Sequence, residues 1–418
     1  MLTTARRQPS PSACVNYRLT FRRDSSRHFR KGYIDMIPAS GSATAPVRPL
    51  VVETPVISAS QVAEVGVGST SEMNTVLLKQ LISALTSMES NNQLEDVRKV
   101  LQQHNLDTSD VDFLKSKVCA AVAEIKAAND KVGAIAKDNK AGATVTVAEM
   151  ISAQYQQVDK TGAALGTIKD EIAQNRIKAN YSENQLKATM QTSLQEIAEA
   201  EEAAKARTGD NEISVHTSYS KLWAVMAEAI KNIRTNYVDF YAGLMQKYTE
   251  MYEAYNEYVQ KASADAVKAG EDGNNVSFNN NTMGQGYDKF NNAVNGMDLG
   301  SVANWDEMSD AQKASMTATL EPAFKVDQSS GKISFNLDQY TGRPYFPSDG
   351  GGDKVSTSSY QAWLASFNAI GTGLQSNMQS FAQRYTQANS TFDNLNKVLS
   401  GAISSMADSA KDVLKALG

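Results

Sequence analysis

The sequence predicts a mainly α fold: a long intramolecular antiparallel coiled coil, an N-terminal helical hairpin or bundle, and a small inserted α+β module. Two long stretches have apolar residues that recur alternately every three and four positions, which averages to the 3.5-residue period of a coiled-coil seam. Only nine prolines occur in 418 residues, mostly outside those stretches. The residues between the two stretches must then form a module at one end of the coiled coil.

The C-terminal stretch, from Tyr360 to Gly418, carries the longer seam. Its apolar positions are Leu374, Met378, Phe381, Tyr385, Ala388, Phe392, Leu395, Leu399, Ala402, Met406 and Val413. A long helix with so narrow an apolar stripe cannot bury the stripe by itself, because helices owe most of their stability to packing. We therefore expect a partner helix.

The best partner in the chain is the stretch from Leu222 to Ala262. Its apolar residues step by three and four until Leu244, where an extra step of four to Tyr248 predicts a stutter that locally unwinds the supercoil. Both seams are rich in aromatic residues and similar in length, which favours one antiparallel pair. The predicted coiled-coil core comprises Trp223, Ile233, Tyr237, Leu244, Phe381, Tyr385, Phe392, Leu395 and Leu399.

The chain divides by composition into a leader at 1–72, an N-terminal helical domain at 73–205, the first coiled-coil helix at 218–267, an inserted module at 268–356 and the second coiled-coil helix at 357–418. Residues 1–35 are rich in arginine; they are read as a targeting or nucleic-acid-binding arm or, preferably, as an extension upstream of a true start at Met36. Residues 36–72 are rich in Ser, Ala, Thr, Pro and Gly and are predicted to be disordered.

The N-terminal helical domain has thin apolar stripes. Asp107-Thr108-Ser109-Asp110 is a helix-start cluster, after which Val111, Leu114, Val118, Ala121, Val122 and Ile125 recur at helical spacing. A turn at 137–144 leads into a long polar helix at about 145–206, whose stripe includes Tyr155, Ile168, Ile172, Ile177, Tyr181, Leu186, Met190 and Ile197. This pattern predicts a hairpin or three-helix element that lies against another part of the protein.

The inserted module begins with a Gly/Asn-rich connector at 269–286. A short amphipathic piece around Phe290 and a helix near 309–320 follow. Residues 332–337 alternate polar and apolar side chains after a turn, which predicts a strand.

No residue pattern indicates catalysis. The three histidines are far apart in sequence, no nucleophile elbow, phosphate loop or CxxC is present, and the two cysteines do not form a disulfide framework. The net charge of −5 argues against nucleic acid as a partner, and no apolar run is long enough for a membrane helix. We therefore predict a protein that is not an enzyme and has no metal or cofactor.

Two segments resemble the IpaD/SipD/BipD family of needle-tip proteins from type III secretion systems. The first is Tyr360-Gln361-Ala362-Trp363 with the run from Ser390 to Ser404, which is similar to the C-terminal signature of that family. The second runs from Leu222 to Tyr252 and is similar to the first long helix of the family, while 331–337 resembles a strand of its central module. The resemblance covers about 218–267 and 325–418, is weak over 73–205 and is absent over 1–72.

The resemblance implies a secreted protein at the needle tip on the bacterial surface, exported by the type III route through an unfolded N-terminal signal in the leader. It implies a small tip oligomer that controls secretion, senses host cues, has a role in host invasion, and has the needle subunit and the translocator proteins as partners. A bile-salt-like ligand is possible on the same basis. The N-terminal hairpin would act as a self-chaperone, although the region before Leu222 is markedly longer here than in the family.

The outward face of the last helix is the predicted contact with the needle subunit. With the seam turned inward, the outward candidates are Asp393, Asn394, Lys397, Ser404, Asp408 and Lys411. Two alternatives remain at this stage: a pore-forming translocator component, which should contain an apolar membrane span, and an extracellular filament or adhesin subunit, which should polymerise alone.

Overall fold

The computed structural model describes residues 117–138, 146–270, 274–349 and 352–417, all within one compact unit. The predictions for the leader, for a start at Met36 and for the helices at 73–116 concern residues outside this part of the chain. The domain boundaries therefore remain predictions.

Two helices form an N-terminal hairpin. Helix α4 spans Lys117–Asp138 and α5 spans Val147–Thr208. Thr146 caps α5: its side chain accepts a hydrogen bond from the Glu149 backbone N–H, and the Glu149 side chain accepts one in return from the backbone N–H of Thr146. At the other end Gly209 has a φ of 69°, a left-handed conformation that glycine adopts without strain. A cap at each end accounts for the sharp limits of this 62-residue helix.

The next long helical stretch runs through α6 (Val215–Ile233), α7 (Asp239–Ala254) and α8 (Lys261–Asp265). Two π-helical segments, η4 (Arg234–Val238) and η5 (Tyr255–Gln260), join them. The predicted stutter between Leu244 and Tyr248 lies within α7, where both residues are buried and the helix stays regular, as a stutter allows. The two π segments also change the phase of the seam, because the backbone there accommodates extra residues within a turn.

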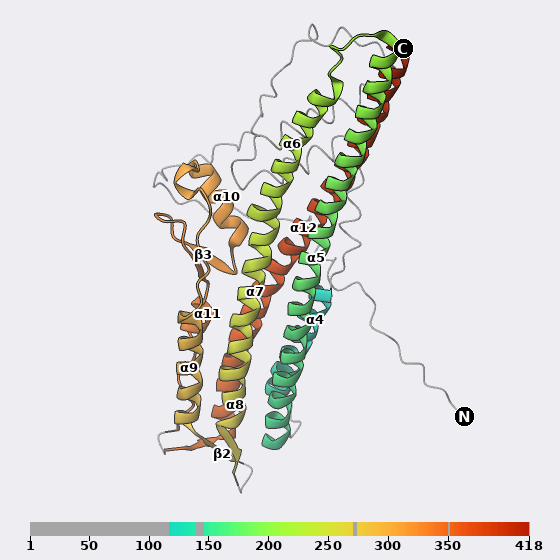
Figure 1. Ribbon diagram of the computed structural model, residues 1–418. Coiled ribbons are helices and arrows are strands. Elements are labelled where there is room, and N and C mark those ends of the chain that lie inside the picture. The colour runs from blue at the N-terminus through green and yellow to red at the C-terminus, as the bar shows by residue number, and fades with distance from the viewer. Residues whose placement is uncertain (1–116, 139–145, 271–273, 350–351, 418) are drawn as a thin grey trace, which may run out of the picture. The chain divides into compact units, whose positions relative to one another are not determined.

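Helix α12 (Thr357–Leu417) has 61 residues and is antiparallel to α6–α8. This direction follows from the contacts that Tyr241 makes with Phe381 and Tyr252 with the carbonyl of Gly371. Figure 1 shows α5 as a third long helix beside these two, and more residues of α12 pack against α5 than against α7. The antiparallel pair is confirmed, but it is not an isolated two-helix coiled coil.

The inserted module combines short strands and helices (Figure 1). Strands β1 (Val267–Ala269), β2 (Asn275–Phe278) and β5 (Lys354–Ser356) form an antiparallel sheet in the order β1-β2-β5, and β3 (Phe324–Val326) pairs with β4 (Ile333–Phe335). The helices are α9 (Asn280–Asn295), the 3₁₀ turn η6 (Trp305–Glu307), α10 (Asp310–Leu320) and α11 (Asp338–Thr341).

The mixed α/β character predicted for the module is confirmed, and β4 lies within the strand expected at 332–337. The connector expected at 269–286 is wrong in part, since β2 and the first turns of α9 lie there. Asn279 caps α9 by accepting a hydrogen bond from the backbone N–H of Thr282. Asparagine therefore starts a helix in a stretch where composition alone suggested a loop.

Buried apolar residues form two clusters along the long helices. The proximal core lies beside the module and includes Tyr241, Tyr248, Phe324 and Phe381. The distal core lies toward the end of α12 and includes Ile197, Trp223, Leu399 and Leu414. Tyr237 packs against both clusters.

Candidate assembly surface

The predicted coiled-coil seam is buried. Trp223, Ile233, Leu244, Phe381, Tyr385, Phe392, Leu395 and Leu399 are all at most 3% exposed, and Tyr237 is partly buried. Tyr241 stacks on Phe381 with ring centroids 5.6 Å apart, and the Tyr248 hydroxyl donates a hydrogen bond of 3.0 Å to the carbonyl of Leu374. These contacts fix α12 against α7 in one register.

The six outward candidates on α12 fall into three groups. Lys397, Ser404 and Asp408 are exposed, whereas Asp393 and Lys411 are only partly exposed. Asn394 is 8% exposed, so the expectation that its side chain faces outward is wrong. The reason is that α12 packs against helices on two sides, which leaves a narrower free face than a two-helix coiled coil would.

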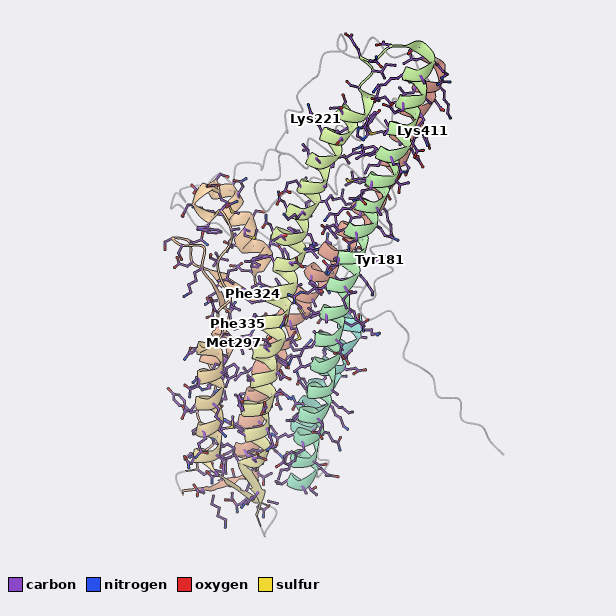
Figure 2. The ribbon with its side chains drawn as sticks, in the orientation of Figure 1. Tyr181, Lys221, Met297, Phe324, Phe335 and Lys411 are labelled. Carbon is purple, nitrogen blue, oxygen red and sulfur yellow. The ribbon has the colours of Figure 1, made fainter. Side chains whose placement is uncertain are left out.

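Helix α5 covers the partly exposed candidates. The Ser182 hydroxyl donates a hydrogen bond of 2.8 Å to Asp393, and the Lys411 ammonium lies 2.7 Å from a carboxylate oxygen of Glu196. Figure 2 shows Lys411 where α12 runs beside α5. Near the end of α12 the Arg207 guanidinium donates to the carbonyl of Leu414 at 3.4 Å. The polar contacts between α5 and α12 therefore involve two of the residues predicted to contact the needle.

These contacts change the pKa values of both residues. Burial raises the pKa of the Asp393 carboxyl above its ordinary value of 3.8, although the hydrogen bond from Ser182 acts in the opposite direction. Hydrogen bonding to Glu196 and to Asp408 raises the pKa of Lys411. If α5 moved away, the carboxylate of Asp393 would become more hydrated, and Lys411 would lose its ion pair with Glu196.

A polar layer lies at the proximal end of the distal core, beside Ala179, Leu186, Phe392 and Leu395. Glu183 on α5 has a side chain only 4% exposed and pairs with Arg234 of η4 at 3.0 Å and with Lys187 at 2.5 Å. On α12 the buried side chains at this level include Asn389, Ser390, Thr391, Asn394 and Asn396. Neither polar atom of the Asn396 side chain has a hydrogen-bond partner within the described part of the chain. Such a layer favours one register of the helices at a cost in stability.

An open groove lies between α4 and α5. Its volume is about 560 Å³, and its lining includes Ala128 and Ala153 together with Lys131, Lys160 and Glu124. The groove thus combines apolar walls with charged groups of both signs. Within the described residues no group of three or more His, Cys, Asp or Glu side chains could hold a metal ion, and no helix is long and apolar enough to cross a membrane.

Sequence reasoning missed the residues by which α5 joins the bundle. Ser182, Glu183 and Glu196 lie on the helix predicted as long and polar, and no pattern around them indicated contacts with other helices. The available signal was the stripe containing Ile168, Ile172, Leu186, Met190 and Ile197, all of which are buried. Three other stripe members, Tyr155, Ile177 and Tyr181, are instead exposed.

The chain is similar to known invasion and translocator proteins. It is 30% identical over 199 residues to Invasin IpaD of Shigella flexneri, an alignment covering 46% of this chain and 60% of that protein. It is 23% identical over 256 residues to Cell invasion protein SipD of Salmonella typhi, covering 57% and 72%. It is 40% identical over 87 residues to Translocator protein BipD of Burkholderia pseudomallei, covering 21% and 27%. The alignment thus spans about three fifths of the IpaD relative.

A family model described as type III secretion systems tip complex components matches residues 53–306 and 348–414. The match covers more than half of the chain, including α5, the α6–α8 stretch and nearly all of α12. The chain belongs to the family of type III secretion system tip complex components.

Proposed function

We propose that this chain is a non-enzymatic needle-tip protein that caps the needle of a type III secretion system, controls secretion there, senses host cues and recruits the translocator proteins. It would be exported by the type III route and act on the bacterial surface as a small oligomer. The observation that carries the proposal is the covering of α12 by α5 through the Ser182–Asp393 and Glu196–Lys411 contacts. Family membership supports the general role.

The proposed mechanism is a change of partner on α12. Lys397, Ser404 and Asp408 are exposed and would contact the needle subunit first. Asp393 and Lys411 would then exchange their contacts with α5 for contacts in the assembly. Both contacts are polar and partly hydrated, so their exchange for new polar contacts has a small net cost.

A reversible crosslink between α5 and α12 tests this mechanism. In a Cys14→Ser/Cys119→Ser background, Ser182→Cys with Asp393→Cys places two thiols where side chains already touch. We expect the double variant to be secreted in its reduced form. Once oxidised outside the cell, it should fail to cap needles, and added reductant should restore capping. The matched controls are the two single-cysteine variants, whose capping should be the same with and without oxidant because neither can form the crosslink. If the oxidised double variant also caps needles, α5 does not have to move.

The tip role itself is tested by complementation of a strain that lacks its tip protein, with chains starting at Met1 or at Met36. We expect the protein at needle ends and restored insertion of translocators. Normal effector delivery without any of this protein at the needle would contradict the role. Polymerisation of the pure protein into filaments would instead favour a filament subunit.

We further propose that a bile-salt-like ligand binds the groove between α4 and α5. The support is the apolar part of the lining and the two lysines, Lys131 and Lys160. They outnumber the one carboxylate of the lining, Glu124, and would pair with the anionic end of such a ligand. Lys131→Glu/Lys160→Glu should weaken deoxycholate binding at least about tenfold, because two attractive charges become repulsive. The control is Lys221→Glu, which changes an exposed lysine on α6. Equal affinities in calorimetry would exclude this groove.

A further inference from the structure

Two large apolar side chains lie exposed on the outer face of α5. Ile177 is 67% exposed and Tyr181, one turn further along, is 63% exposed. Of the large apolar residues that the structure describes, only these two are exposed within one turn of each other. Adjacent exposed side chains of this size are typical of contacts between proteins, in which tyrosine is enriched.

The charge around this apolar pair is positive. Lys178 is exposed, and Arg176 is half-buried and donates a hydrogen bond of 3.2 Å to the neutral side chain of Gln246. The two carboxylates of α5 between positions 171 and 195, Glu171 and Glu183, are both buried. A matching partner surface would therefore be acidic and partly apolar. We call this surface the α5 patch and define it by Arg176, Ile177, Lys178 and Tyr181.

The outer half of the inserted module has such a surface. Between positions 298 and 332 the chain has six carboxylates and three lysines, of which Lys325 pairs with Asp338 at 2.5 Å. Met297 and Leu299, on either side of the first carboxylate, are half-buried apolar residues. All six carboxylates are exposed and define the acidic surface of the module: Asp298, Asp306, Glu307, Asp310, Glu321 and Asp327.

Both surfaces lie at nearly the same level along the long helices. The Arg384 guanidinium of α12 donates a hydrogen bond of 2.8 Å to the carbonyl of Ala318 in α10, which fixes the acidic surface against α12. Ser182, next to Tyr181, donates to Asp393 of the same helix. Arg384 and Asp393 are nine residues apart, which is about 14 Å along a helix of about 90 Å.

The two surfaces lie on opposite sides of the bundle. Figure 2 shows Tyr181 on one side of the long helices and Phe324 and Phe335, from the strands beside the acidic surface, on the other. Figure 1 shows α10 and β3 on that other side, away from α5. One copy therefore cannot bring its own two surfaces together, whereas two parallel copies can. A contact between two different surfaces forms a ring if its repeated rotation closes.

We propose that copies of this chain associate head to tail, with the α5 patch of one copy on the acidic surface of the module of the next. Ile177 and Tyr181 supply the apolar part of the contact, and Lys178 faces the carboxylates of the neighbour. The proposal rests on the small tip oligomer proposed above and identifies the two surfaces that hold its copies together.

Site-specific photocrosslinking of the full-length protein tests which surface meets Tyr181. The variant Tyr181→p-benzoylphenylalanine is irradiated as concentrated pure protein, and the crosslinked peptides are identified by mass spectrometry. We expect adducts between copies that join position 181 to residues 297–327. The same photoreactive residue in place of Val225, which is exposed on α6, should not reach those residues. Adducts that join 181 to 181, adducts confined to one chain, or no adducts between copies would contradict the proposal.

A charge exchange tests the same contact without a crosslink. Lys178→Glu should weaken self-association in analytical ultracentrifugation roughly twofold to fivefold, in line with the modest energy of an exposed ion pair. Asp306→Lys/Glu307→Lys should weaken it at least as much, and the chain that carries all three changes should recover part of the lost affinity. The controls Lys221→Glu, on α6, and Asp353→Lys, beside β5, should leave the affinity unchanged. A triple variant weaker than both of its parents would overturn the proposal.

Needle localisation separates this proposal from the tip role. If the photoreactive variant is found at needle ends but its crosslinks map to other residues, the tip role stands and the proposed contact is wrong. If the expected crosslinks form in the pure protein but the chain is absent from needle ends, the contact stands and the tip role is wrong.

Discussion

The proximal and distal cores are built from the same long helices but are held differently. In the proximal core α12 packs against α4, α5, α7 and the module, and tyrosine hydroxyls of α7 donate to α12 carbonyls at Leu374 and Gly371. In the distal core α5, α6, α12 and Val238 of η4 contribute, and α5 supplies Ala179, Leu186, Met190, Ile197 and Ala204. The difference indicates that separating α5 from α12 requires less free energy in the distal half, where the proposed needle contacts lie.

The largest effect should come from the proximal core. Phe381→Ala removes a ring that contacts Tyr241 and Phe324, and should lower the free energy of unfolding by about 3–5 kcal/mol. The measurement is urea unfolding followed by circular dichroism. Tyr345→Ala is the control, since Tyr345 is 98% exposed and its loss should change stability by less than about 0.5 kcal/mol.

Leu399→Ala makes the matching change in the distal core and should cost about 2–5 kcal/mol. If the cores unfold together, both variants shift one transition. If Leu399→Ala produces an early transition that Phe381→Ala does not, the distal core is a separate cooperative unit. If the distal core unfolds after the proximal core, it is not the less firmly held of the two, and the comparison above is wrong.

The polar layer at the proximal end of the distal core should give an intermediate effect. Glu183→Ala leaves Arg234 without its most buried partner and should cost about 2 kcal/mol. The double variant Glu183→Leu/Arg234→Leu should lie within about 1 kcal/mol of the parent, because it removes both charges. Denaturant unfolding of the parent, Glu183→Leu, Arg234→Leu and the double variant completes the double-mutant cycle. A double variant as unstable as Glu183→Ala would show that the pair stabilises the fold rather than only setting its register.

The smallest effects concern two aspartates with opposite pKa shifts. Burial raises the pKa of Asp393, so its contribution to stability is present below pH 3.8 and is lost as the pH rises through the raised value. Hydrogen bonds from Ser329 and Ser330 lower the pKa of Asp327 in the β3–β4 turn to about 2, so its contribution is present above pH 3.8 and is lost as the pH falls through about 2.

The pKa values of both carboxyls can be measured by NMR titration, with Asp393→Asn and Asp327→Asn as assignment controls. Asp393→Asn should reduce the loss of stability on going from acid to neutral pH. Asp327→Asn should lower stability at neutral pH and leave it unchanged below about pH 2, where the parent carboxyl is protonated. Titration of Asp393 below its ordinary value would show that α5 does not desolvate it.

The long helices were predictable because their signals are local. The sequence predicted a helix at about 145–206. The capping box of Thr146 and Glu149 and the left-handed Gly209 set the observed limits. The final helix, predicted from 357, begins at Thr357. Strands β1, β2, β3 and β5 were not predicted, since each has only three or four residues and no longer alternating run around it. Strand β4 is equally short but was predicted, because the alternation around it extends over 332–337.

The candidate site was predictable only in part. Periodicity identified the seam that includes Phe381 and Leu399, because burial on one face repeats with the helix. It could not show that Asn394 is buried. The period tells on which face of the helix a residue lies, but not how many other helices pack around that helix.

The sequence by itself determined which residues form long helices, which residues lie in their apolar seams and which family the chain resembles. These features depend on the order and spacing of residues along the chain. Only the tertiary structure decided that α5 lies beside α12, that Asp393 and Lys411 are partly covered by it, and that Ile177 and Tyr181 are left exposed. Those facts depend on contacts between residues more than two hundred positions apart, such as Ser182 with Asp393 and Glu196 with Lys411. No local pattern encodes such a pairing, since an apolar stripe states that a partner is needed and not which helix supplies it.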